Sequence, residues 1–100
     1  MSVNIGVCFS VYDLKVEDAE VIYKLFEKVV KETQLEPEVI IALRDNDDGT
    51  RDVRVVSEQL VVFSRFYEWR PTFEESLQRQ VTEAVQSAKV SFEWHYAEED

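Results

Sequence analysis

Residues 3–12 read VNIGVCFSVY, and apolar and polar side chains alternate along the whole stretch. Successive side chains of a β-strand point to opposite faces of a sheet, so this period of two predicts a strand with one covered face. Residues 90–96, VSFEWHY, alternate in the same way. The chain therefore carries an amphipathic strand near each end, and each strand needs a layer that covers its apolar side.

Two helical patterns can supply that layer. The acidic residues Glu17, Asp18 and Glu20 favour a helix start, because negative charge complements the positive end of the helix dipole. An apolar stripe with helical spacing follows, and Pro37 is expected to mark the end of the helix. Thr72 and Glu75 have the spacing of a capping box, which predicts a second helix that starts there with Pro71 just outside. The two stripes are Ile22, Leu25, Phe26, Val29 and Val30, and Phe73, Leu77, Val81, Ala84, Val85 and Ala88.

The middle of the chain, residues 38–57, is predicted to form a β-hairpin. Residues 38–44 and 52–57 are β-rich, and the Asp, Asn and Gly residues between them tolerate the positive φ angles of a tight turn. The apolar run at residues 60–63 is either a separate strand or a continuation of the previous strand past a bulge.

The order of these elements predicts an α+β fold of the ferredoxin-like β-α-β-β-(β)-α-β type. Two helices are expected on one face of a mostly antiparallel sheet of four or five strands, with both terminal strands in the middle. The hundred residues fit a single domain that spans the chain. The uncovered face of the sheet is expected to carry Asn4, Cys8, Ser10, Tyr12, Ser91, Glu93 and His95.

Composition narrows the function classes. Cys8 is the single cysteine, so no intramolecular disulfide can form, and one His with one Cys cannot build a structural zinc site. We therefore expect a cytoplasmic protein without metal or cofactor. Glycine-rich phosphate loops, nucleophile elbows and long apolar runs are absent from the sequence, which lowers the expectation of an enzyme and argues against a membrane protein.

The charge is unusual for such a small chain. The 21 acidic residues exceed the 11 basic residues and give a net charge of −10. Such a field repels nucleic acid and anionic membranes and attracts a basic protein surface or a cation. The acidic stretch Asp45-Asn46-Asp47-Asp48-Gly49 does not match a calcium-binding EF-hand loop, because Gly49 is fifth rather than sixth and Val56 occupies the twelfth position, where a glutamate is needed.

A cluster of aromatic residues is a second candidate for a partner-binding region. Phe66, Tyr67 and Trp69 are bracketed by Arg65 and Arg70, and Trp, Tyr and Arg dominate the energetics of protein interfaces. We expect Phe66 and Trp69 to divide between core packing and partner binding.

Glu93 and His95 form the best candidate for chemistry. They share a strand face within expected reach of Tyr12 or Ser10, and histidine is the usual general base near neutral pH. A polar open sheet face produces such pairs by default, so the sequence favours no catalytic residues.

Small size, negative charge and missing catalytic motifs predict a non-enzymatic module that neutralises a basic protein such as a toxin or nuclease. In these bulk properties the chain resembles immunity proteins, antitoxins and phage-encoded inhibitors. One alternative is a small-molecule-binding or catalytic ferredoxin-like domain that acts as a homodimer, with Tyr12, Glu93 and His95 lining a pocket. Another is a structural subunit of a larger assembly that makes its contacts through the open sheet face and the free strand edges. The predicted partner-binding residues are Tyr12, Asp45, Asp47, Asp48, Tyr67, Trp69, Glu93, His95, Glu98 and Glu99.

Overall fold

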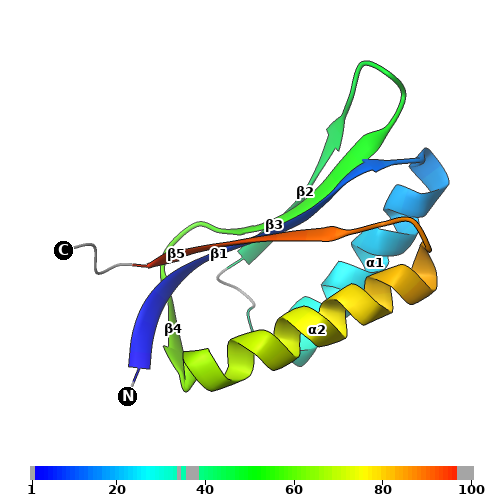
Figure 1. The fold of residues 1–100 in the computed structure, drawn as a ribbon. Helices are drawn as coiled ribbons and strands as arrows, with labels where there is room; N and C mark the ends of the chain where they lie inside the picture. The colour runs from blue at the N-terminus through cyan, green and yellow to red at the C-terminus, as the bar shows by residue number, and fades with distance from the viewer. Residues whose placement is uncertain (1, 34, 36–38, 97–100) are drawn as a thin grey trace.

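Two helices lie along the same face of a twisted five-stranded antiparallel sheet (Figure 1), as the element order predicts. The computed structural model describes residues 2–33, 35 and 39–96. Within those residues no helix is both long enough and apolar enough to cross a membrane. The elements are β1 (Ser2–Leu14), α1 (Val16–Glu32), β2 (Val39–Asp45), β3 (Arg51–Ser57), β4 (Val61–Ser64), α2 (Phe66–Ala84) and β5 (Val90–Tyr96).

Strand β1 is the centre of the sheet. Residues 8–11 pair with both β3 and β5, so these two strands lie on opposite edges of β1. Ile5 pairs with Tyr96 on β5 and with Val61 on β4, which puts β4 on the same edge of β1 as β3. The run at 60–63 is therefore a separate short strand, and it follows the line of β3 along β1.

Strand β5 is outermost among the described strands, so the prediction that both terminal strands lie in the middle of the sheet is wrong. The reason is the number of available edges. One edge of β1 is shared by β3 and β4, β5 takes the other, and β5 pairs with β1 alone. The order across the sheet is β2, β3 with β4, β1, β5.

The core lies between this sheet and the helices. Its largest fully buried side chains include Phe9 of β1, Phe26 of α1 and Leu77 of α2. The ring of Phe9 meets the ring of Phe26 edge-on, with 5.1 Å between centroids. Phe9 thus joins the central strand to the first helix, and aromatic pairs in this geometry add to the free energy gained by burial.

Helix α1 follows its predicted stripe, with Ile22, Phe26, Val29 and Val30 buried. It ends at Glu32, and the hydroxyl of Thr33 donates to the carbonyl of Val29 across 2.7 Å. The helix is thus already finished before Pro37, which lies outside the described residues.

Helix α2 begins at Phe66, so the prediction of a start at Thr72 is wrong. Pro71 lies inside the helix, where its missing N–H and its ring ordinarily destabilise a helical turn. Burial of Phe66, which is 1% exposed, offsets much of this cost, because fully burying a large apolar side chain stabilises a fold by roughly 1.5–3 kcal/mol. The helix also ends at Ala84, so Val85 and Ala88 are buried by the following turn rather than by the helix.

The carboxylate of Asp52 ties two irregular parts of the sheet together. Its Oδ1 accepts the backbone N–H of Asp13 and the side-chain amide of Asn46, each across 2.9 Å. Asp13 has a φ of 60° at the point where the pairing of β1 with β3 shifts. Asp52 therefore supports both the irregularity in β1 and the β2–β3 turn.

Candidate interaction surface on the open sheet face

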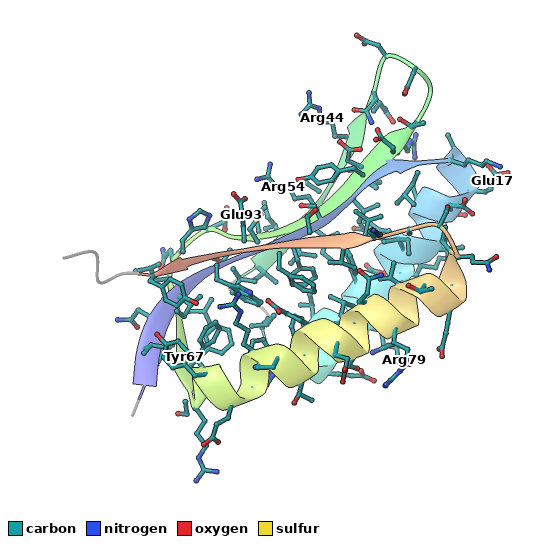
Figure 2. The ribbon with its side chains drawn as sticks, viewed as in Figure 1. Glu17, Arg44, Arg54, Tyr67, Arg79 and Glu93 are labelled. Atoms are coloured by element: carbon teal, nitrogen blue, oxygen red, sulfur yellow. The ribbon has the colours of Figure 1, made fainter. Side chains whose placement is uncertain are left out.

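The side of the sheet that faces away from the helices is the candidate functional surface, here called the open sheet face. Figure 2 shows Arg44, Arg54 and Glu93 pointing from the sheet to the side opposite the two helices. The alternation of the strands and their pairing assign its other members. The open sheet face comprises Asn4, Cys8, Ser10, Tyr12, Ile40, Ala42, Arg44, Asp52, Arg54, Val56, Leu60, Val62, Ser91, Glu93 and His95.

Two rows of side chains cross this face at right angles to the strands. One row runs from Ser91 on β5 through Ser10 on β1 to Arg54 on β3. The neighbouring row runs from Glu93 through Cys8 to Val56. Arg54 and Glu93 therefore lie on opposite sides of β1, at levels that are two residues apart along the strand.

Arg54 covers the centre of the face. The Cys8 thiol beside its guanidinium raises the pKa of Arg54 above its ordinary value, and electrostatic interactions with Tyr12 and Glu93 add to this effect. Cys8 and Ser10 are buried although they point away from the helices, because the longer side chains around them shield them from solvent.

Four large apolar side chains of the open sheet face remain exposed. Tyr12 is 50% exposed and Val62 is 68% exposed, and Ile40 and Leu60 are nearly as accessible as Tyr12. Single exposed apolar residues are normal on protein surfaces, whereas neighbouring ones indicate an interaction site. Val62 is opposite Asn4 and Leu60 lies beside Gly6, so these two are neighbours, while Tyr12 lies at the other end of β1.

Gly6 belongs to the same face beside His95. A methyl group in place of its hydrogen would lie 3.1 Å from Cβ of His95 and 3.6 Å from Cδ2 of Leu60. The absence of a side chain at Gly6 lets His95 and Leu60 pack against the β1 backbone.

Strands β1 and β5 are neighbours as the sequence-based hypothesis required, but they do not bring Tyr12 to His95. His95 is opposite Gly6, whereas Tyr12 lies beyond Val11, the last residue of β1 that pairs with β5. Six residues of strand separate the levels of Tyr12 and His95, which is roughly 20 Å at about 3.3 Å per residue. The prediction that Tyr12, Glu93 and His95 together line one pocket is therefore wrong.

The acidic turn between β2 and β3 uses two of its carboxylates for its own structure. Asp45 forms an ion pair with Arg51 across 2.6 Å. Asp48 accepts the hydroxyl of Thr50 across 2.6 Å and its backbone N–H across 3.0 Å, and these bonds lower the pKa of Asp48. Asp47 is exposed and takes part in none of these bonds. Glu98 and Glu99 lie outside the described residues.

The aromatic segment lies far from this turn (Figure 2), since Tyr67 is at the opposite end of the molecule from the β2–β3 hairpin. Tyr67 is 65% exposed and stacks on Tyr96 with 6.3 Å between ring centroids. Trp69 instead packs into the helix–sheet interface, with centroids 4.5 Å from Phe73 and 4.9 Å from Phe63. Both Phe66 and Trp69 point inward, so the expected division of the two between core and surface is wrong. Among the described residues, Tyr67 and the acidic β2–β3 turn do not form one continuous surface.

A hollow of about 410 Å³ lies on the helix side, between α1 and the β2–β3 hairpin. Charged side chains of both signs line it, including Glu20, Lys24 and Arg51. Over residues 2–33, 35 and 39–96, no group of three His, Cys, Asp or Glu side chains is arranged to hold a metal ion.

Sequence reasoning missed the arginines and most of the apolar residues of the open sheet face. The alternation of residues 39–45 and 51–57 could have revealed Arg44 and Arg54. Each occupies one of the alternate positions of its strand whose side chains point away from the helices. Leu60 and Val62 required the position of β4 beside β1, which no local pattern indicates.

Comparison with known proteins supports the fold. No protein-family model matches the chain, and no curated protein matches it. A solved structure that is similar in fold is that of a dimeric ferredoxin-like protein from an uncultured marine organism. It is 16% identical in sequence, the match covers 97% of this chain and 98% of that one, and the TM-score is 0.61. The chain described here therefore has a ferredoxin-like α+β fold.

Proposed function

We propose that this protein is a non-enzymatic interaction module that works as a homodimer, with the open sheet face as its interface. The observation that carries the proposal is the pair of exposed apolar side chains Leu60 and Val62, which are neighbours on that face, with Ile40 and Tyr12 exposed elsewhere on it. Removing them from water contributes about 25 cal/mol for each Å² of apolar surface, which offsets the cost of bringing two copies together.

A second copy of the chain is the partner that fits this surface best. The face carries arginines on β2 and β3 and a glutamate on β5, so it can complement itself in charge. The similar solved structure is described as dimeric. Sheets commonly pack face to face about 10 Å apart, and two copies of this face would form such a sandwich with the helices outside.

The test is the molar mass in solution across a concentration series, measured by light scattering after size-exclusion chromatography. We expect a dimer for the native chain and a monomer for Val62→Asp, because the new carboxylate would be buried without a partner. Val21→Asp is the matched control, since Val21 is an exposed valine on α1, away from the sheet face. A native chain that stays monomeric at every concentration would overturn the proposal.

The capture of a basic protein is a second candidate. It is favoured by the exposed carboxylate of Asp47 on the β2–β3 hairpin, which extends beyond the helices (Figure 1), together with the net charge of −10. Charges of this kind accelerate association with a basic partner.

Affinity capture from a lysate with a salt gradient tests this second candidate. The native chain and Asp47→Lys should differ in their yield of one basic protein. A basic protein that both retain equally would show that the hairpin carboxylate is not part of the contact.

A further inference from the structure

The tip of the β2–β3 hairpin contains a chemically reactive pair of residues. Asp48 is followed by Gly49, and no other Asp or Asn in the sequence precedes a glycine. The backbone nitrogen that follows an aspartate can attack the side-chain carboxyl, and a glycine at that position hinders the attack least because it has no Cβ. Attack of the main chain on a side chain is therefore least hindered at this point of the chain.

The reaction releases and consumes only water. The Gly49 nitrogen forms a bond to Cγ of Asp48, and the bond between Cγ and one carboxyl oxygen breaks. That oxygen leaves as water, which takes the carboxyl proton and the amide proton, and a cyclic imide remains. Water then opens the ring at either carbonyl. One opening restores aspartate, and the other gives isoaspartate, in which the main chain runs through the former side chain.

The surroundings of Gly49 leave room for the ring. Asp48 and Gly49 are both exposed, and the hairpin extends beyond the helices (Figure 1). A Cβ built on Gly49 would meet no described atom within 4 Å outside its chain neighbours. Packing therefore does not prevent the ring from closing, and the restraint must come from contacts within the turn.

Hydrogen bonds within the turn hold both reacting groups. Oδ1 of Asp48 accepts the hydroxyl of Thr50 across 2.6 Å and its backbone N–H across 3.0 Å. The N–H of Gly49 donates to the carbonyl of Asn46 across 3.2 Å. The carboxylate is thus held by Thr50 while the attacking nitrogen is held by Asn46, so these bonds must break before the two groups can react.

The bonds to Thr50 also keep the carboxyl in its less reactive form. They hold the pKa of Asp48 below its ordinary value, which favours the ionised carboxylate. An ionised carboxylate is a poor electrophile, because the departing oxygen needs the carboxyl proton to leave as water. Thr50 therefore restrains the reaction through both the position and the charge of the carboxylate.

We infer that Asp48 is a site of slow spontaneous conversion to isoaspartate, and that its hydrogen bonds to Thr50 set the rate of this conversion. The product lengthens the main chain of the turn by one carbon atom. Because turn length fixes the register of a hairpin, the conversion weakens the pairing of Asp45 with Arg51. The conversion does not depend on the proposed homodimer.

The rate of isoaspartate formation in the native chain, Thr50→Val and Thr50→Ser tests the inference. Each folded chain is kept at physiological temperature for several weeks and digested with trypsin, which releases residues 45–51 as one peptide. Liquid chromatography with electron-transfer fragmentation then measures isoaspartate at Asp48 separately from Asp47. We expect Thr50→Val to convert about three- to tenfold faster than the native chain, as for the loss of one ordinary hydrogen bond, and Thr50→Ser to convert at the native rate.

Two further chains complete the experiment. Asp48→Glu keeps the charge but would have to close a larger ring, so its peptide should contain no isomer at this position. The native chain unfolded in urea should convert faster than the folded chain. Equal rates for Thr50→Val and the native chain, or for the folded and unfolded native chain, would overturn the role of Thr50. Absence of isoaspartate at Asp48 in folded Thr50→Val would overturn the site itself, and circular dichroism checks that the variants are folded.

Discussion

Glu74 on α2 accepts a hydrogen bond from the indole N–H of Trp94 on β5, with 2.7 Å between Oε2 and Nε1. The same oxygen accepts from Nε of Arg70 across 3.0 Å, and Arg70 donates in turn to the hydroxyl of Tyr96 across 2.9 Å. The hydrogen bond to Glu74 raises the pKa of Arg70. One carboxylate therefore links the second helix to the outermost strand.

Removal of this carboxylate should destabilise the fold. Glu74→Ala leaves the half-buried donors of Trp94 and Arg70 without an acceptor, and we expect a loss of about 1–3 kcal/mol in the free energy of unfolding. Guanidinium unfolding followed by tryptophan fluorescence measures it. Glu75→Ala is the control, because Glu75 is exposed, and its effect should stay within about 0.5 kcal/mol. Equal losses for the two variants would contradict the role of the Trp94 contact.

Asp52 should contribute more to the free energy of unfolding than the other acidic residues near the β2–β3 turn. Asp52→Ala removes the acceptor of both Asp13 and Asn46, and we expect the free energy of unfolding to fall by about 1–3 kcal/mol in urea. Asp47→Ala, in the same turn, should change it by less than about 0.5 kcal/mol. An Asp52→Ala variant as stable as Asp47→Ala would show that the two hydrogen bonds contribute nothing.

The turn should weaken in acid through Asp48. Its pKa is lowered by the hydroxyl and the backbone N–H of Thr50. A carboxylate with a lowered folded pKa contributes stability that is complete above its unfolded pKa, about 3.9, and is lost as the pH falls through the lower folded value. An NMR titration should therefore give the Asp48 carboxyl a pKa below the ordinary value for aspartate. Thr50→Val should move the Asp48 midpoint upward, and a native midpoint at the ordinary value would refute the assignment.

Phe66 and Tyr67 should respond very differently to truncation. Phe66 is fully buried against Phe63 and Trp94, so Phe66→Ala should cost about 3–5 kcal/mol of the free energy of unfolding. Tyr67 is mostly exposed, and Tyr67→Ala should cost less than about 1 kcal/mol. Thermal unfolding compares the two. Similar losses would mean that α2 does not depend on Phe66 for its first turn.

Much of the candidate interaction surface could be predicted from the sequence. Alternation alone predicts that Tyr12, Glu93 and His95 share the uncovered side of the sheet. The pairing of β1 with β5 puts Glu93 and His95 there, and Tyr12 follows Ser10 on the same side of β1. The position of each residue along the face was not predictable. Tyr12 and His95 are near opposite ends of the β1–β5 pairing, and register depends on contacts between segments about eighty residues apart.

Local patterns determined the element types because they report on interactions within a few residues. The alternation at 3–12 specifies a strand, and the stripe from Ile22 to Val30 specifies a helix face, whatever packs against them. The order of such elements was enough for the ferredoxin-like fold class.

Tertiary structure decided where α2 begins, which strand is outermost, and which charges share the open face. The capping residues at Thr72 predict one start, but the burial of Phe66 between β4 and β5 favours an earlier one. The outer position of β5 follows from β3 and β4 sharing an edge of β1. Each of these outcomes depends on surfaces buried between distant segments, and the free energy of such burial exceeds the local preferences that a sequence pattern records.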